Sequence, residues 1–377
     1  MASNRKVNMV KGDIESTGVA KKIVMYSRTD PTGEKFLRYL KYVTFLKKKF
    51  TGTGSQSPWK ELKTQGALEG IMLSLKKLFV SEDVAKLTNV DEQANKKGAN
   101  QNQNSTVKDI CSMSLSVLSH SFALDYSIRS EAVKNGFISS LQQFIANFTK
   151  DTFIVFKHAE MLSRAVRCIA NLSNDSHCRE SVLRTGVAIS ILRILELVDE
   201  KMNSDTFKDA TSGQSFVDKV VNKNLICSCI RAIRILTSDS KLTSNGRSHL
   251  LRFGSLVTVI NTLTWDGNLS SDETFVLDVV RALNFLSVRI RSAPPDVVDT
   301  LIYNPEVCKI RRLIKIFEGS QPDGKLFTPV IKCLINFSAN KEISDCIGSL
   351  RIFPIILEKL DVLNENYYHG KLNSIVP

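Results

Sequence analysis

The chain has 377 residues, 43% of them hydrophobic, which is enough for a packed core, so disorder along its whole length is excluded. Its 51 Lys and Arg outnumber 38 Asp and Glu, and the net charge of +13 favours acidic partners. No run approaches the roughly 18 apolar residues of a membrane span, and the start lacks the apolar core of a secretory signal. With eight cysteines scattered through helical segments, this predicts a soluble protein of the cytosol, or also of the nucleus, without a membrane partner.

Residues 1–32 are basic and predict a partly disordered segment. From residue 33 a helix-period pattern recurs to residue 361. Its most regular part is a helix with a basic or apolar first residue followed by small and apolar ones. The runs are KYVTFLK at Lys41, the run at Met113, RCIANLS at Arg167, RAIRILT at Arg231, RALNFLS at Arg281 and KCLINFS at Lys332. Their apolar residues fall on one face, which predicts buried helices.

A second element follows each of these helices, a sharp turn between a short helix and a longer one. A residue at the turn must adopt the left-handed conformation, which glycine and asparagine tolerate best. The predicted turn residues are Gly66, Gly136, Gly186, Gly254, Asn304 and Arg351. Only Arg351 departs from this chemistry, and Pro354 three residues later partly restores a signal for the start of a helix. Each unit is therefore a short helix, a turn and two longer helices.

This pattern resembles the armadillo repeat, most closely in AVRCIANLSNDSHCRESVLRTGVAISILRIL from Ala165 and in KCLINFSANKEISDCIGSLRIFPIILEKL from Lys332. The resemblance implies an all-α, right-handed α-solenoid, an armadillo-like superhelix of about six three-helix units. The units are longer than the family's usual size of about 40 residues, which indicates insertions. Polar inserts are predicted over about 89–106 and 199–213, and residues 362–377 are a C-terminal tail.

Motifs for chemistry are missing from the sequence. Cys227 and Cys229 point apart on a helix and cannot chelate a metal from one face, while Cys168 and Cys333 occupy small-residue positions of the core. The histidines show no metal spacing and no recurring partner. We therefore expect no enzyme activity, no metal and no cofactor.

In armadillo arrays the third helices line a concave groove, and the peptide-import members place Trp and Asn at two positions of each. Here the first position is mostly basic and never Trp, and only two of six second positions are Asn. The groove residues that the resemblance implies are Lys41, Arg167, Asn171, Arg231, Ile235, Arg281, Phe285, Lys332 and Asn336. A basic groove repels basic peptides and suits an acidic segment with apolar anchors. The alternative is structural, with each arginine stem covering apolar neighbours.

These features predict a protein–protein interaction scaffold that binds an acidic and apolar segment. The third helices also resemble those of animal adaptors that join armadillo repeats to a BTB domain, which implies substrate recognition for a cullin ubiquitin ligase as one alternative. The other is a basic nucleic-acid-binding repeat protein, because lysines cluster near the N-terminus. Aromatic residues of the kind that stack on bases are not interleaved with those lysines.

Overall fold

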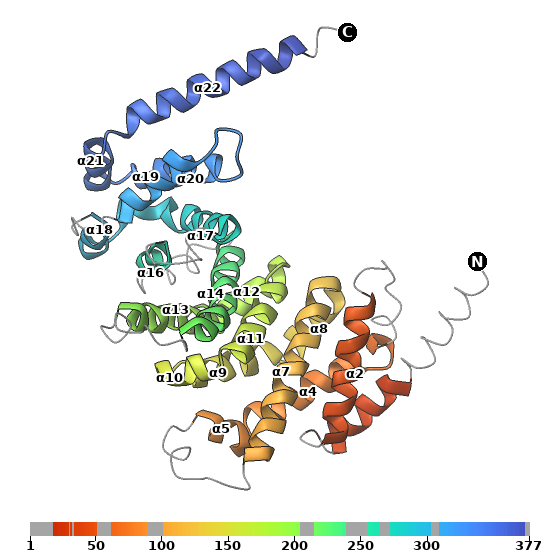
Figure 1. Ribbon diagram of the computed structural model, residues 1–377. Helices are drawn as coiled ribbons and strands as arrows, with labels where there is room; N and C mark the ends of the chain where they lie inside the picture. The colour runs from red at the N-terminus through yellow and green to blue at the C-terminus, as the bar shows by residue number, and fades with distance from the viewer. Residues whose placement is uncertain are drawn as a thin grey trace. The chain divides into compact units, whose positions relative to one another are not determined.

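The structure is a computed structural model, and it describes residues 18–29, 31, 34–50, 62–88, 101–203, 215–238, 255–263, 272–302 and 309–373. Every regular element in these ranges is a helix (Figure 1), which confirms the prediction of an all-α chain. The chain divides into two compact units. Unit 1 comprises Met1–Leu197 and Ala210–Ala232, and unit 2 comprises Val198–Asp209 and Ile233–Pro377.

Unit 1 contains the helices that carry the first part of the repeat pattern. They are α2 (Glu34–Phe50), α4 (Ala67–Phe79), α5 (Glu82–Thr88), α7 (Gln101–Leu124), α8 (Tyr126–Lys134), α9 (Phe137–Phe148), α10 (Thr152–Lys157), α11 (Ala159–Leu172), α12 (Ser176–Arg184) and most of α13 (Val187–Asn203) and α14 (Ser215–Thr237). Helix α2 packs against α7, and α7 packs against α11, so equivalent helices of successive repeats are neighbours. In the same way α4 packs against α9.

Unit 2 repeats this arrangement with the later helices. They are α16 (Ser255–Asn261), α17 (Glu273–Leu286), the 3-10 helix η2 (Ser287–Ser292), α18 (Pro295–Ile302), α19 (Lys309–Gly319), α20 (Phe327–Phe337), α21 (Lys341–Ser349) and α22 (Ile352–Asn373). Helix α17 packs against α20, and these are the helices that carry Arg281 and Lys332.

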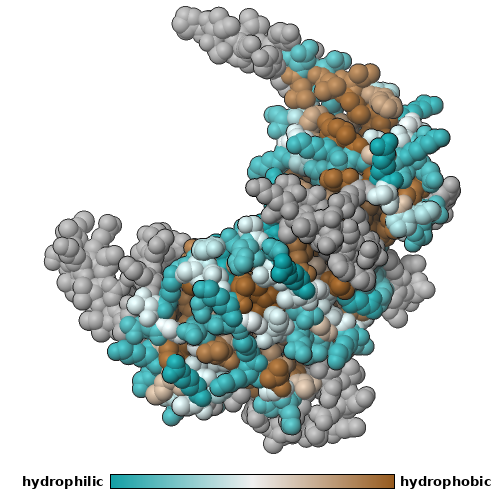
Figure 2. Space-filling view, turned by 180° about the vertical axis from the view of Figure 1, so that it is seen from behind, coloured by the Kyte–Doolittle hydropathy of each residue, from teal (hydrophilic) through white to brown (hydrophobic). Residues whose placement is uncertain are grey.

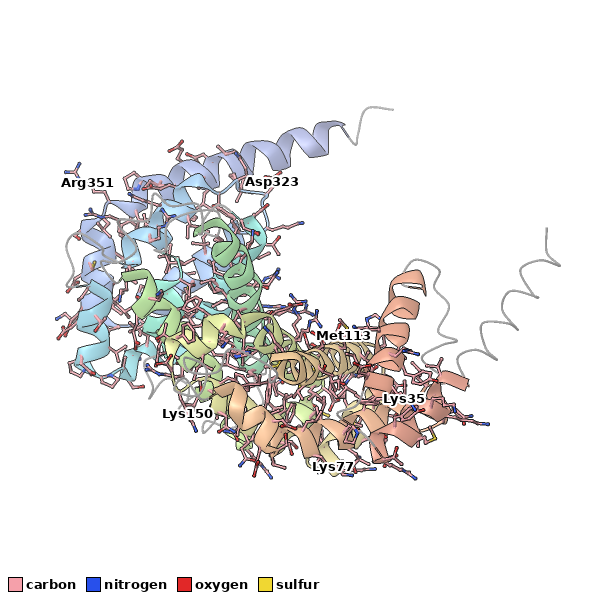
Figure 3. All side chains as sticks on the ribbon, turned by 60° about the horizontal axis from the view of Figure 1, so that its bottom comes forward. Lys35, Lys77, Met113, Lys150, Asp323 and Arg351 are labelled. Carbon is pink, nitrogen blue, oxygen red and sulfur yellow. The ribbon has the colours of Figure 1, made fainter. Side chains whose placement is uncertain are left out.

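The predicted turns have the predicted backbone. Gly66, Gly136 and Gly186 precede α4, α9 and α13 with φ angles of 71°, 65° and 74°. Arg351 adopts the same left-handed conformation, with φ 53°, although its Cβ disfavours it; its side chain points away from unit 2 into solvent (Figure 3). Repeat geometry therefore overrides the local preference of the residue at this turn. Gly254 and Asn304 lie outside the described residues.

Aspartate and asparagine caps start several of the helices, because a side-chain oxygen satisfies amide groups that have no partner within the helix. Asp151 accepts from the amide of Phe153 at 2.7 Å and Asp175 from that of Cys178 at 3.0 Å. In unit 2, Asn340 accepts from the amide of Ile343 at 3.2 Å. Short polar segments before α10, α12 and α21 thus fix where each short helix begins.

Aromatic side chains fill the core both between neighbouring repeats and within one repeat. In unit 1, Phe79 stacks on Phe144 with ring centroids 4.2 Å apart, which joins α4 to α9. In unit 2, Phe317 stacks on Phe327 at 5.4 Å and joins α19 to the start of α20. Burying each such ring contributes about 1.5 to 3 kcal/mol. In each unit the core therefore lies between the packed helices, where these rings meet.

Helices extend into three segments that the sequence analysis placed outside the repeat array or in its inserts. Residues 18–29 form a helix, where a partly disordered segment was expected, and it lies close to α4: Ser74 Oγ donates to the Ser27 carbonyl at 3.2 Å, and a Cβ on Gly70 would lie 2.7 Å from Ser27 Oγ. The absence of a side chain at Gly70 permits this approach. The expected inserts are shorter, since α7 begins at Gln101 and α13 continues to Asn203. The expected tail is largely helix, because α22 continues to Asn373. Residues 89–100 and 204–213 lie outside the described residues.

Candidate interaction surface

The basic residues at the first position of the third helices all lie at the surface. Lys41, Arg167 and Arg231 in unit 1 are exposed, and so are Arg281 and Lys332 in unit 2. Within the described part of the chain, none of the five forms an ion pair with a carboxylate. Among the described residues, no carboxylate therefore balances their charges.

Arg167 is held in place by a neutral group. Its Nε donates to the hydroxyl of Ser228 on α14 at 3.1 Å. Ser228 Oγ also lies 2.9 Å from Ser163 Oγ and donates to the carbonyl of Asn224 at 2.6 Å, so a buried hydroxyl pair joins α11 to α14. Burial of part of the guanidinium, with the like charges of Arg164 and Arg231, lowers the pKa of Arg167. Arg167 is exposed as a residue, while its head group is partly desolvated and surrounded by positive charge.

A carboxylate does lie near the row in unit 2, but it is already engaged. Asp278 is one turn before Arg281 on α17, and its Oδ1 lies 2.9 Å from Nε of Arg234. That contact is an ion pair whose angle does not make a hydrogen bond, since Nε of Arg234 has no hydrogen-bond partner. Arg281 is left without a partner of opposite charge among the described residues.

The second position of the third helices has two different environments. The two asparagines donate from Nδ2 to the preceding third helix, Asn171 to the Ser119 carbonyl at 2.7 Å and Asn336 to the Asn284 carbonyl at 2.9 Å. Ile235 is only 7% exposed and belongs to the core. Asn171, at 8%, is buried as well. The prediction that Ile235 and Asn171 line a groove is therefore wrong, because their side chains are used for packing between helices.

Two apolar residues are exposed that the sequence analysis missed. Val288, which follows α17, is 53% exposed, and Ile335 on α20 is 61% exposed, whereas Phe285 is half-buried. Val288 lies in η2, seven residues after Arg281, and Ile335 lies on α20, three residues after Lys332. Helical spacing could have found these two residues, because positions three, four and seven residues after a basic residue lie near it on a helix. The sequence analysis considered only the position four residues after it.

A further apolar face lies on α22. Phe353 and Leu357 are each 63% exposed and Leu360 is 47% exposed. Figure 2 shows hydrophobic side chains gathered at this C-terminal part of unit 2. On the opposite side of the helix, Lys359 donates to the Ser320 carbonyl at 2.7 Å and lies 5.7 Å from the Phe317 ring centre, which fixes α22 to α19. By contrast the lysines of α2 and α4 at Lys35 and Lys77 point outward from unit 1 (Figure 3).

The thiols are protonated core groups where they are buried. Cys168 and Cys333 are fully buried, as expected from their small-residue positions. Burial raises the pKa of Cys111 and of Cys333 to about 12 and that of Cys229 further. These thiols are not nucleophiles near neutral pH.

His158 is the buried histidine of unit 1. It is 2% exposed, its Nε2 lies 3.1 Å from the Leu87 carbonyl, and its ring meets Phe148 edge-on at 5.2 Å. Burial, with the charges of Lys108 and Lys157, lowers its pKa to about 4. The neutral ring with the proton on Nε2 fits this site, and its role is structural.

Within the described ranges, no three His, Cys, Asp or Glu side chains are grouped to hold a metal ion. No helix among the described residues is both long and apolar enough to cross a membrane.

Comparison with known proteins adds little to this geometry. No family model and no curated protein matches the chain. Among solved structures, the chain is similar to the crystal structure of an engineered protein, with 12% sequence identity over 89% of this chain and 93% of that chain and a TM-score of 0.37. A similarity this low supports no argument about function.

Proposed function

We propose that the chain is a non-enzymatic protein–protein interaction scaffold of the armadillo type, a right-handed α-solenoid whose third helices contact an acidic segment with apolar side chains. The repeated left-handed turns at Gly66, Gly136, Gly186 and Arg351 support this architecture. So do the asparagine bonds from Asn171 and Asn336 to the preceding third helix. Contacts between equivalent helices, α2 with α7, α7 with α11, and α17 with α20, are what stacked repeats require.

One observation carries the proposed partner chemistry. Exposed basic side chains recur at the same position of the third helices, and no carboxylate among the described residues pairs with them. In the structural alternative, the stem of each basic side chain covers apolar neighbours, and its charged head group can pair with a carboxylate close by. In unit 2 the nearest such residue, Asp278, is paired with Arg234 instead. Unpaired cations at the same position of several third helices favour an acidic partner in solution.

Val288 and Ile335 supply the apolar part of the proposed contact. They replace Ile235, whose burial removes it from any surface. An exposed ion pair is worth only about 0.2 to 1 kcal/mol, so the cations orient the partner, and apolar contacts provide most of the affinity. Binding of the partner segment to unit 2 therefore requires the two cations, Arg281 and Lys332, together with the two apolar side chains, Val288 and Ile335.

The test is selection of peptides by the purified full chain from a random displayed library, followed by affinity measurement on the best sequences. We expect acidic peptides with aliphatic residues, and we expect Arg281→Glu/Lys332→Glu to reduce their affinity by at least tenfold. Arg311→Glu/Lys315→Glu is the matched control, since it makes the same charge change at exposed positions of α19 in unit 2. Selection of basic peptides, or equal losses in the two variants, would contradict the proposal.

Ubiquitin-ligase adaptor function and nucleic-acid binding remain the alternatives, and no contact among the described residues favours either over peptide binding. Tight, salt-sensitive binding to arbitrary nucleic acid, lost on raising salt from 50 to 200 mM in the way that phosphate contacts predict, would favour the second.

A further inference from the structure

Three arginines lie near one another on two helices of unit 1, because the charges of Arg164 and Arg231 both act on Arg167, which is bonded to Ser228. Arg164 and Arg167 are one turn apart on α11, and Ser228 and Arg231 are one turn apart on α14. The bond from Arg167 Nε to Ser228 Oγ, at 3.1 Å, holds the two helices' basic positions together. The helix pair therefore presents a small group of guanidinium donors, of which Arg167 is held in place by Ser228.

The positive charge of this group is not neutralised within the described residues. Nη2 of Arg164 pairs with Oε1 of Glu160 at 2.5 Å, but its Nη1 is buried and has no hydrogen-bond partner. Arg167 and Arg231 have no carboxylate partner at all in that part of the chain. After the pairing of Arg164 with Glu160, two positive charges remain on neighbouring helices. Such a site is stabilised by an anion of charge close to −2.

We propose that Arg167 and Arg231 bind one phosphate monoester, carried by a phosphorylated serine or threonine in the acidic segment of the partner. This inference rests on the proposed function and specifies the ligand of its unit 1 part. A phosphate monoester carries about −1.5 to −2 at pH 7 and offers three acceptor oxygens. Arginine binds phosphate through paired N–H groups, and with Nε of Arg167 donated to Ser228, both of its Nη groups serve the ligand.

A phosphorylated peptide fits the site better than a nucleic acid does. Each backbone phosphate of a nucleic acid carries a single charge, and affinity for it comes from many such contacts along a groove. Binding of single strands also uses aromatic platforms for the bases. Helix α11 and the part of α14 from residue 223 onward contain no aromatic residue.

The experiment uses the full chain with inorganic phosphate and O-phosphoserine as probes. We expect both to raise the melting temperature above that in sodium chloride of equal ionic strength, and serine to have no effect. Calorimetric titration of O-phosphoserine should show affinity falling about tenfold for each guanidinium removed in Arg167→Gln and Arg231→Gln. The control Lys134→Gln/Arg184→Gln removes two exposed cations from α8 and α12 of the same unit and should bind as the unmodified chain does.

Arg231→Gln decides the matter if Arg167→Gln impairs folding, because Arg231 makes no hydrogen bond within the described residues. The phosphate site would be overturned if phosphate and O-phosphoserine raised the melting temperature no more than sodium chloride does. It would also be overturned if the control variant lost as much affinity for O-phosphoserine as the arginine variants. Tighter binding of a single-stranded oligonucleotide than of O-phosphoserine, lost in the same two variants, would overturn it in favour of nucleic acid. Peptide binding through Arg281 and Lys332 is measured separately, so the proposed function survives a failure of this site.

Discussion

The two units make the same contact between third helices under different conditions of burial. Asn171 in unit 1 is 8% exposed when it donates to the preceding helix, whereas Asn336 in unit 2 is half-buried. Unit 1 also buries His158 and the hydroxyl pair of Ser163 and Ser228. A polar group has greater energetic consequence where water cannot replace its partner. The position in the repeat therefore determines that the asparagine bonds to the preceding helix. The burial around that bond determines how much it contributes to the free energy of unfolding.

The largest expected effect is the pH dependence that His158 gives to unit 1. Its pKa is about 4 in the folded chain against about 6.5 when unfolded, so the unfolded chain binds the extra proton first as the pH falls. Stability from the neutral ring is complete above pH 6.5 and is lost between pH 6.5 and about 4, by about 3 kcal/mol. Urea unfolding followed by circular dichroism at several pH values measures this.

The control for this prediction is His158→Gln, which keeps a donor for the Leu87 carbonyl but does not titrate. The difference in free energy of unfolding between the two proteins should narrow as the pH falls from 6.5 to 4. A difference that stays constant over this range would mean that His158 titrates alike in both states.

The asparagine pair provides the direct comparison of the units. Asn171→Leu should lower the free energy of unfolding by about 2 kcal/mol, since it removes a buried hydrogen bond. Asn336→Leu should cost about 1 kcal/mol or less, because water reaches the half-buried site. Urea titrations of the two variants test the order. Equal losses would show that the exposure of the bond does not set its contribution.

Much of the repeat could be predicted from the sequence because its signals are local. Glycine at positions 66, 136 and 186 and the apolar period of the third helices each depend on residues close in the chain. The exposure of each basic first position also followed from that period.

What could not be predicted depends on contacts between distant segments. The helix over residues 18–29 contains many polar residues, and it lies close to α4 because Gly70 lets Ser27 approach, a pairing 43 positions apart in the sequence. Ile235 and Phe285 share a repeat position but differ in burial, since burial depends on what the neighbouring helix places against them. The partner of Asp278, which is Arg234 and not Arg281, is likewise decided by the relation between two helices.

The smallest expected effect concerns the left-handed turns, glycine at Gly186 in unit 1 and arginine at Arg351 in unit 2. A Cβ on Gly186 would lie 4.0 Å from Cδ1 of Ile189, so a substitution there meets no clash and its cost is conformational. Gly186→Ala should lower the free energy of unfolding by about 1 kcal/mol, and Gly186→Asn by less. Arg351→Gly removes the strain of φ 53° but adds freedom to the unfolded chain, so the net gain should be at most about 0.5 kcal/mol. Thermal unfolding of the three variants measures this order, and a loss of stability in Arg351→Gly would mean that the arginine side chain itself stabilises the start of α22.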